Sequence, residues 1–213
     1  MRLFLLPLFS AGCLLAQPAL TPSIVNVGPV HAGDVVTINI SLSGSSGQNY
    51  AGTQWTTSIP TGFSWTVTAG AASTAAGKQV TCGVTGALMT CVAVGQTLTV
   101  FADGVVAQMV ATVPKSQAIG NLLINLSLPY GASATGSLVA TTITPTLTLP
   151  IVASPCDLNS DGITDVKDFA LMLNQVVGVT ACTQDLDGDG KCTVNDILRI
   201  VVAMTGGACR TGQ

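Results

Sequence analysis

Apolar and polar residues alternate with a period of two along most of the chain between residues 21 and 152. The clearest case is 35–42, where Val36, Ile38, Ile40 and Leu42 share one face and polar side chains occupy the other. This alternation is typical of β-strands with one buried face. Further strands are predicted over 53–59, 63–68, 78–84, 87–94, 97–101, 105–113, 122–128, 137–142 and 146–152.

Turn residues separate these predicted strands. Gly, Pro and Asn recur at intervals of about 8–12 residues, as they do in all-β sandwiches and barrels. The strand over 122–128 is regular, because Leu122, Ile124, Leu126 and Leu128 share one face. The sequence therefore predicts a mainly β first domain over 17–152, and none of it has the pattern of a long amphipathic helix.

The pattern changes from period two to period 3.6 after Val152-Ala153-Ser154-Pro155. One helix is predicted over 166–177, with Gly178 as its stop, and a second ends at Gly206-Gly207. Their apolar stripes contain Phe169, Met172, Leu173 and Val176 in the first helix, and Val194, Ile197, Leu198, Val201 and Met204 in the second. We expect a small all-α tail over 153–213, held close to the β domain because the joint is only a few residues long.

A loop with an oxygen-bearing side chain at every second position precedes each predicted helix. Loop 1 (residues 157–168) begins Asp-Leu-Asn-Ser-Asp-Gly, and loop 2 (residues 185–196) begins Asp-Leu-Asp-Gly-Asp-Gly. Oxygens at the first, third and fifth places, with Gly at the sixth, allow a short loop to wrap a hard divalent cation such as calcium. The seventh residue offers its backbone carbonyl, the ninth acts through water, and an Asp at the twelfth closes the site.

The sequence therefore predicts two Ca²⁺ ions, one in each loop. The predicted ligands are Asp157, Asn159, Asp161, Ile163, Asp165 and Asp168 in loop 1, and Asp185, Asp187, Asp189, Lys191, Thr193 and Asp196 in loop 2.

Charge is distributed very unevenly. The chain contains no Glu, and eight of its ten Asp residues lie between residues 157 and 196. From residue 17 to 153 the only formal charges are Asp34, Lys78, Asp103 and Lys115. The two lysines are predicted to be solvated loop charges. Because no basic patch exists, nucleic acid is excluded as a partner.

The first residues predict export. Arg2 precedes a short apolar run, and Leu14-Leu15-Ala16 provides a small-residue exit, so residues 1–16 form a predicted signal peptide. Ser10-Ala11-Gly12-Cys13 resembles a bacterial lipoprotein cleavage box, which leaves lipidation at Cys13 open. No later stretch reaches the ~20 apolar residues that a transmembrane helix needs. We expect a secreted or cell-surface protein without a transmembrane segment.

Six further cysteines in an exported chain favour disulfides. Cys82 and Cys91 are expected to pair within the β domain. The other four allow three pairings, among which we favour one that ties the two ends of the tail and one that pins loop 2 to the segment before it. These favoured pairs are Cys156–Cys209 and Cys182–Cys192.

Catalytic side chains are scarce. His31 is the only His and is expected to lie at an ordinary surface turn. Glycoside hydrolysis needs a pair of carboxyl groups, and Asp34 and Asp103 are the only two in the β domain; both stand beside Gly, where capping a turn is the simpler role. No enzymatic activity is therefore expected. An aromatic cluster could stack on a sugar ring, although a core position is favoured for its members, Tyr50, Trp55, Phe63 and Trp65.

The tail resembles a dockerin domain from about residue 156 to 209. The loop-helix units are duplicated, each ends in Asp at its twelfth place, and Pro155-Cys156 leaves no room for a helix entering loop 1. Dockerins fold on binding calcium and dock onto cohesin domains of scaffold proteins in extracellular polysaccharide-degrading complexes. The tenth and eleventh loop places are the recognition positions of that family. The resemblance thus implies a partner-binding face with Val166, Lys167, Val194 and Asn195.

The β domain resembles a cohesin-like jelly-roll sandwich over about 120 residues. The resemblance rests on residues 33–42, 51–56, 103–107 and 116–128. Together the two resemblances imply a secreted, non-catalytic, calcium-binding assembly protein, linked to polysaccharide binding or degradation. It would meet a cohesin- or dockerin-bearing protein on another chain. A different class stays open, namely a cell-surface adhesin or carbohydrate-binding protein with a calcium-stabilised tail.

Overall fold

The computed structural model describes residues 16–25 and 28–212. The expected signal peptide lies outside this part of the chain apart from Ala16, and so does Cys13. The described strands are β1 (Ala19–Ile24), β2 (Val35–Ser43), β3 (Tyr50–Ser58), β4 (Ser64–Ala69), β5 (Gln79–Thr85), β6 (Leu88–Val94), β7 (Gly104–Thr112), β8 (Gly120–Ser133), β9 (Leu138–Val139), β10 (Thr142–Ile143) and β11 (Thr146–Ile151). The described helices are α1 (Ala71–Ala75), α2 (Val166–Val176) and α3 (Val194–Met204).

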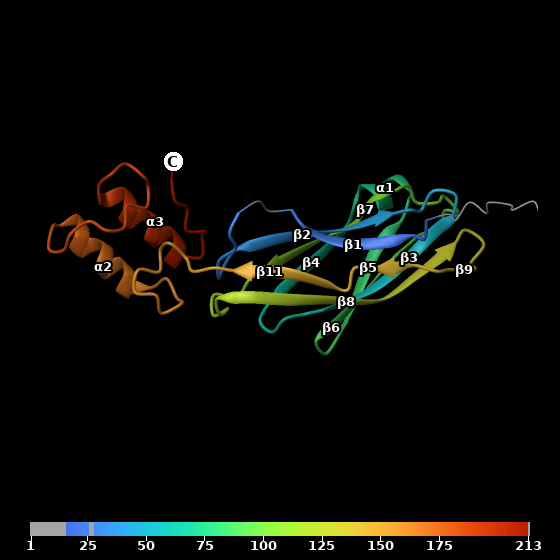
Figure 1. Ribbon diagram of the computed structural model, residues 1–213, viewed down its shortest axis with the longest axis horizontal. Helices are drawn as coiled ribbons and strands as arrows, with labels where there is room; N and C mark the ends of the chain where they lie inside the picture. The colour runs from blue at the N-terminus through green and yellow to red at the C-terminus, as the bar shows by residue number, and fades with distance from the viewer. Residues whose placement is uncertain (1–15, 26–27, 213) are drawn as a thin grey trace, which may run out of the picture.

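The strands form two sheets that make up the elongated body of the molecule (Figure 1). One sheet has the order β10-β1-β2-β7-β4, and the other has the order β11-β8-β3-β6-β5, with β9 paired to β8. β1 and β10 pair in parallel, and the other named pairs are antiparallel. A single buried cluster takes side chains from both sheets, so the architecture is a β-sandwich.

The alternation in the sequence accounts for this core. Val36, Ile38, Ile40 and Leu42 of β2 are all buried, and they belong to the same cluster as Trp55 of the other sheet. Burying one large apolar side chain contributes about 1.5–3 kcal/mol. The predicted fold class, mainly β with a small helical C-terminal part, is confirmed.

The predicted strand over 97–101 is wrong, because this segment forms no strand and pairs in neither sheet. The Lys78 ammonium donates to the carbonyl of Thr97 at 2.6 Å, and the N–H of Phe101 donates to the carbonyl of Tyr50 at 2.7 Å. Lys78 is therefore not the solvated loop charge expected from the sequence. It is 4% exposed, and burial lowers its pKa because the charged form loses water.

Leu128 does not lie on the buried face of its strand. Its φ is 50°, and the register between β3 and β8 shifts opposite it, between Gln54 and Thr56. A residue in the left-handed conformation, together with a register shift, interrupts the alternation of buried and exposed side chains along a strand. Leu128 is consequently exposed, which corrects the predicted alternation at this one position.

β1 was not predicted, because Pro22 interrupts its apolar pattern. In the sheet, Pro22 faces Ile40 of β2, whereas β10 on the other side pairs only with Ala19 and Leu20. On the side of β1 away from β2, Pro22 therefore has no paired strand to which an N–H would donate, and such a position in a sheet tolerates Pro.

The aromatic residues are mostly core residues. Tyr50 and Trp55 are fully buried, Phe63 is buried, and the rings of Phe63 and Trp65 stack with centroids 6.0 Å apart. The favoured core interpretation is confirmed for the first three, and a sugar-stacking platform that includes Tyr50 and Trp55 is wrong.

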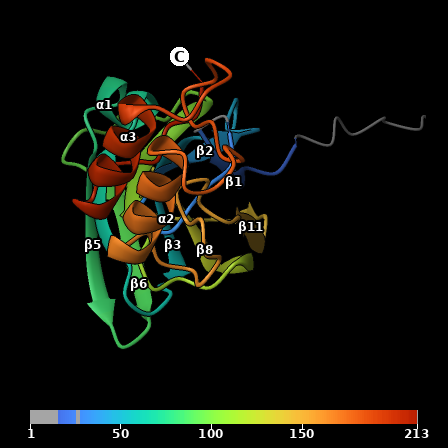
Figure 2. The same cartoon turned by 90° about the vertical axis from the view of Figure 1, so that its left-hand side faces the viewer.

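The C-terminal helical region (residues 152–212) has its own small core between α2 and α3, which face the viewer in Figure 2. Its disulfides join Cys156 to Cys209 and Cys182 to Cys192, and a third disulfide joins Cys82 of β5 to Cys91 of β6. These are the three pairs that the sequence favoured. The buried apolar residues of the region are Cys156, Met172, Leu186 and Ile200.

The buried faces of the two helices differ from the predicted stripes. Met172 of α2 is buried as expected, but Leu173 beside it is exposed. In α3 the buried apolar residue is Ile200, which the predicted stripe omitted, whereas Leu198 and Val201 are exposed. At 100° per residue, the true buried face of α3 is rotated by about 90° from the predicted one.

The helical region lies at one end of the sandwich, on the left in Figure 1. The N–H of Val152 donates to the carbonyl of Val30 at 2.8 Å, which fixes the exit from β11. The Lys115 ammonium donates to the carbonyl of Met204, in the last turn of α3, at 3.3 Å. A cation at a helix C-terminus is favourable, so Lys115 contacts the helical region and is more than a solvated loop charge.

Candidate metal-binding loops

Each loop ends in a capping box that starts a helix. In α2, the Asp165 carboxylate caps the helix and the Asp168 carboxylate accepts from the N–H of Asp165 at 2.8 Å. In α3, Thr193 and Asp196 form the same reciprocal pair, with a distance of 2.7 Å from the N–H of Thr193 to the carboxylate. This arrangement satisfies N–H groups that a helix otherwise leaves unpaired. The loops are thereby fixed to the helices that follow them.

Loop 2 brings three carboxylates together. Asp185, Asp187 and Asp189 have oxygens that all lie within 4.8 Å of one another. Asp185 accepts from the N–H of Gly190 at 2.6 Å, and this bond chiefly lowers the pKa of its carboxyl group. Gly190 has a φ of 83°, which is the turn conformation expected of the sixth place.

Loop 1 has the same backbone plan with a different charge balance. Asp157 is buried and accepts from the N–H of Gly162 at 2.9 Å, and Gly162 has a φ of 88°. Asp161 accepts from the Lys167 ammonium at 2.9 Å and from the amide of Asn159 at 2.9 Å. The bond from Lys167 is the main cause of the lowered pKa of Asp161.

The twelfth-place Asp residues are fully buried and bond to the backbone. One oxygen of Asp168 accepts from the N–H groups of Leu158 and Asn159, at 2.7 and 3.1 Å. Asp196 is bonded in the same way to Leu186 and Asp187. These two residues therefore tie the start of each loop to its helix, and Asp196 does not belong to the three-carboxylate cluster of loop 2.

The seventh and ninth places hold less direct evidence for a cation. Ile163 and Lys191 donate their N–H groups to Asp161 and Asp189, and ligation through their carbonyls stays a prediction. The ninth-place residues have a role that the sequence reasoning missed, since Asp165 and Thr193 are the N-caps of the helices. The sequence contained a signal for this role, because Asp165 and Thr193 are residue types that N-caps prefer and each stands three residues before an acidic residue.

The donor set suits a hard cation. Both loops supply carboxylate oxygens on alternate residues, loop 1 adds the amide oxygen of Asn159, and no thiolate or imidazole stands among them. Calcium takes such oxygen ligands, whereas zinc prefers sulfur and nitrogen. The Lys167 ammonium forms ion pairs with Asp161 and Asp165 of loop 1, at 2.9 and 3.9 Å.

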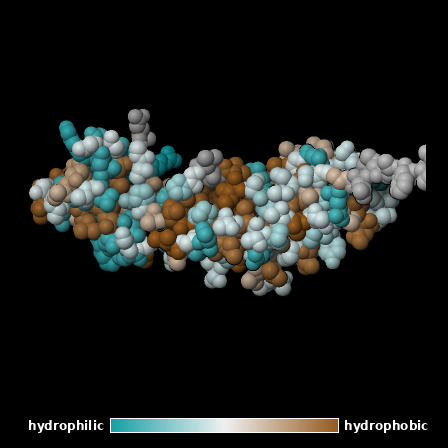
Figure 3. All heavy atoms as spheres, viewed as in Figure 1, coloured by the Kyte–Doolittle hydropathy of each residue, from teal (hydrophilic) through white to brown (hydrophobic). Residues whose placement is uncertain are grey.

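The predicted partner positions lie at the surface. Val166, Lys167, Val194 and Asn195 are all exposed, at the N-terminal turns of α2 and α3. Space filling shows apolar residues at the surface of the helical region, at the left end of Figure 3. Its exposed large apolar side chains include Leu171, Leu173, Val177, Leu198, Val201 and Val202. Exposed apolar side chains gathered on neighbouring helices are a feature of interaction surfaces.

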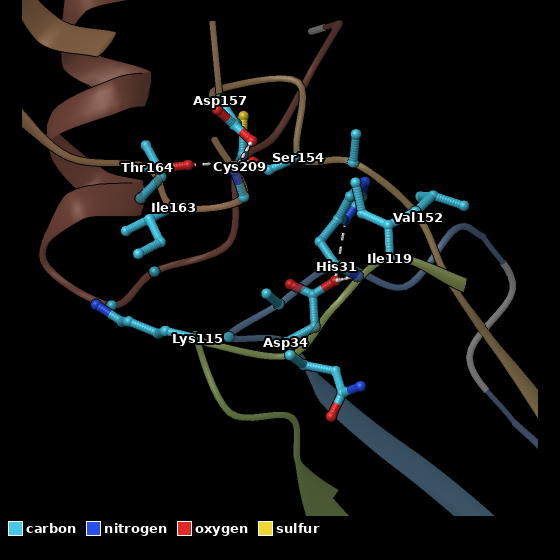
Figure 4. Close-up of a pocket in the computed structure, with 18 residues that line it drawn as sticks. His31, Asp34, Lys115, Ile119, Val152, Ser154, Asp157, Ile163, Thr164 and Cys209 are labelled. Atoms are coloured by element: carbon cyan, nitrogen blue, oxygen red, sulfur yellow. Dashed lines mark hydrogen bonds and ion pairs between the residues drawn. The ribbon is translucent and has the colours of Figure 1, made fainter. Parts of the chain in front are cut away.

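A pocket lies between the helical region and the end of the sandwich (Figure 4). Asp157 and Ile163 of loop 1 line one wall, and His31 and Asp34 line the other. The His31 ring nitrogen Nδ1 lies 3.1 Å from Asp34 Oδ2, and the His31 side chain is only 13% exposed. His31 is therefore part of this contact and not the ordinary surface residue expected from the sequence.

Asp34 and Asp103 cannot act as a glycosidase pair. Asp34 precedes Val35 at one end of β2, whereas Asp103 precedes Gly104, which pairs with Leu42 at the other end. Seven residues of strand place them roughly 25 Å apart, beyond the 5–9.5 Å that such pairs span. Asp103 instead accepts from the N–H groups of Gly44 and Ser45 and caps their turn.

The comparisons with known proteins concern the sandwich. No family model and no curated protein matches the chain. Solved structures match it, among them a non-cellulosomal cohesin from Archaeoglobus fulgidus, with 14% identity and a TM-score of 0.52 over 65% of this chain and 93% of that one.

Two further matches are crystal structures of complexes. The sixth cohesin of Acetivibrio cellulolyticus scaffoldin B, in complex with a Cel5 dockerin mutant, is 18% identical, with a TM-score of 0.53 over 64% of this chain and all of that one. A type I cohesin–dockerin complex from Clostridium thermocellum is 15% identical, with a TM-score of 0.55 over 64% of this chain and all of that one. At these identities the likeness shows the fold, which is a cohesin-like β-sandwich.

None of the described helices is both long enough and apolar enough to cross a membrane.

Proposed function

We propose that this chain is an exported, non-catalytic assembly protein whose C-terminal helical region binds calcium and docks onto a protein of another chain. The observation that supports this most is the pair of equivalent loops at the N-termini of α2 and α3. Each loop gathers oxygen donors, and exposed apolar residues stand on the helices that follow. The module is dockerin-like, with residues 17–152 and 153–213 as the two domains.

The sandwich supports the same role. The three solved structures named above are cohesins, two of them in complex with a dockerin. The partner of this chain is accordingly a cohesin- or dockerin-bearing protein in trans. The three disulfides suit an extracellular or cell-surface location, because such bonds persist in oxidising compartments. A link to polysaccharide degradation belongs to this proposal.

The predicted loop ligands would hold one Ca²⁺ in each loop. A bound cation supplies positive charge that offsets the repulsion among the carboxylates, and its binding free energy adds to folding. The chain's own residues then present the helices: Asp168 and Asp196 fix the loops to α2 and α3, and the valines at the tenth places stand exposed.

Docking in trans follows from the position of the helical region. The N–H of Val152 bonds to Val30, and Lys115 bonds to Met204, so the region is held at the end of the sandwich. A linker of a few residues at no more than ~3.6 Å each cannot carry the helices over to a sheet face of the same chain. A partner surface must therefore come from another molecule.

The test uses residues 17–213 as bait for the exported proteome, with calcium and then with chelator. We expect bait with calcium to capture a partner, and we expect chelator or the double variant Val166→Asp/Val194→Asp to abolish this capture. Val179→Asp should preserve capture, because Val179 is an exposed valine away from the loops. The double variant should still bind calcium in calorimetry. Capture that ignores both chelator and the double variant would contradict the proposal.

Glycan binding by residues 17–152 alone, unaffected by removal of the tail, would favour the carbohydrate-binding alternative.

A further inference from the structure

Lys167 distinguishes the two loops. It stands at the eleventh place of loop 1, and its ammonium lies 2.9 Å from Asp161 Oδ2 and 3.9 Å from Asp165 Oδ2. The side chain is 65% exposed, so it is free to swing into water. The ion pair of Lys167 with loop 1 is therefore exposed to solvent.

Loop 2 has no such cation. Its eleventh residue is Asn195, and its one lysine, Lys191, stands at the seventh place. Within residues 16–25 and 28–212, the carboxylates of loop 2 form no ion pair. Loop 2 also has Asp187 at the third place, where loop 1 has the neutral Asn159. Loop 1 in turn has Asp165 at the ninth place, where loop 2 has Thr193, so each predicted ligand set holds four carboxylates. The difference that remains is the ammonium of Lys167, which is ion-paired with ligands of loop 1.

We infer that Lys167 makes loop 1 the weaker calcium site, so that loop 2 fills first and loop 1 fills only after the lysine has left Asp161. This inference rests on the proposed calcium binding. The number of charged ligands tunes the calcium affinity of such loops, and because that number is equal in the two loops, the ion-paired ammonium of Lys167 is the difference that acts on affinity. An ammonium that holds a ligand oxygen must be displaced before a cation can use that oxygen, and the displacement weakens binding without blocking it.

Calorimetric titration of residues 17–213 with calcium chloride tests the inference. Loop 1 is isolated in the background Asp187→Asn/Asp189→Asn, which removes two exposed or half-buried charges of loop 2 and keeps an acceptor oxygen at each place. In this background we compare Lys167→Met, which removes the charge, with Lys167→Arg, which keeps it. Lys191→Met in the wild-type chain is the matched control for removal of a lysine.

We expect the wild-type chain to bind two ions with unequal dissociation constants, and the background to retain the weaker one. Lys167→Met should tighten that constant roughly two- to fivefold, as expected for loss of an exposed ion pair. Lys167→Arg and Lys191→Met should leave the constants unchanged. If Lys167→Met leaves the constant of the background unchanged while the wild-type chain binds two ions, the inference is wrong and the proposed calcium binding stands. If no calcium binds to the wild-type chain, both are wrong.

Discussion

The two disulfides of the helical region should contribute unequally to its stability. Cys156–Cys209 spans 53 residues and Cys182–Cys192 spans 10. In the chain-entropy model, closing these loops in the unfolded state contributes about 4.1 and about 2.7 kcal/mol. Replacing the first pair by Ala should therefore cost about 1.5 kcal/mol more than replacing the second. Loss of buried Cys156 from the small core acts in the same direction.

The chain offers separate probes for its two parts. Both Trp residues, Trp55 and Trp65, lie in the sandwich, so Trp fluorescence follows the sandwich alone. α2 and α3 have eleven residues each and α1 only five, so helical circular dichroism follows mainly the C-terminal region. Urea unfolding of each double variant, followed by both signals, measures the two contributions.

We expect Cys156→Ala/Cys209→Ala to lower the helical midpoint most, Cys182→Ala/Cys192→Ala to lower it less, and the Trp midpoint to stay within error in both. Equal losses, or a larger loss for the shorter loop, would refute the loop-length reasoning. A fall in the Trp midpoint would refute the independence of the two cores.

Three further changes test the site and the buried charges. Asp196→Ala removes the acceptor of three backbone N–H groups and should destabilise the helical region by at least about 3 kcal/mol even without calcium. Asp187→Asn should not have this effect. Unfolding in the presence of chelator, followed by circular dichroism, measures both variants. The Ser45 hydroxyl lowers the pKa of Asp103, so the charged carboxylate stabilises the sandwich above its ordinary pKa of about 3.9, and this stability is lost as the pH falls through the lowered pKa. Asp103→Asn should therefore destabilise the sandwich near neutral pH and become as stable as wild type in acid. Acid titration followed by Trp fluorescence measures this difference. Burial lowers the pKa of Lys78, so the unfolded chain binds the proton of this side chain more tightly than the folded chain does. The free energy of unfolding should therefore rise as the pH increases from the lowered pKa toward about 10.4. Lys78→Met should flatten this rise, which urea midpoints at alkaline pH measure.

The sequence was most informative where its signals are local. The loops, both helices and most strands follow from spacing and turn residues, and α2 starts at the predicted residue, 166. The disulfide pairs followed from a simple topological argument. These features depend on neighbours within a few residues or on a small number of combinations.

Features that depend on distant segments were not predictable. Ile200 is buried because Cys156, Met172 and Leu186 meet it across the small core, and no pattern within α3 shows that rotation. The segment 97–101 has strand-like alternation, but Lys78 takes the carbonyl of Thr97. Leu158 and Leu186, at the second place of each loop, pack on the core and were overlooked, although their equivalent positions in the two loops were the available signal.

The two loops are equivalent in spacing but not in their surroundings. Asp157 and Ile163 of loop 1 line the pocket against His31 and Asp34, so a rearrangement of loop 1 alters the contact with the sandwich. Loop 2 lies beside the C-terminal segment, where the N–H of Gly212 donates to the carbonyl of Leu186 at 3.0 Å. If loop 2 fills first, calcium stabilises the helices without disturbing the sandwich contact. Filling of loop 1 then acts on that contact, because the loop that Lys167 weakens is the loop that faces the sandwich.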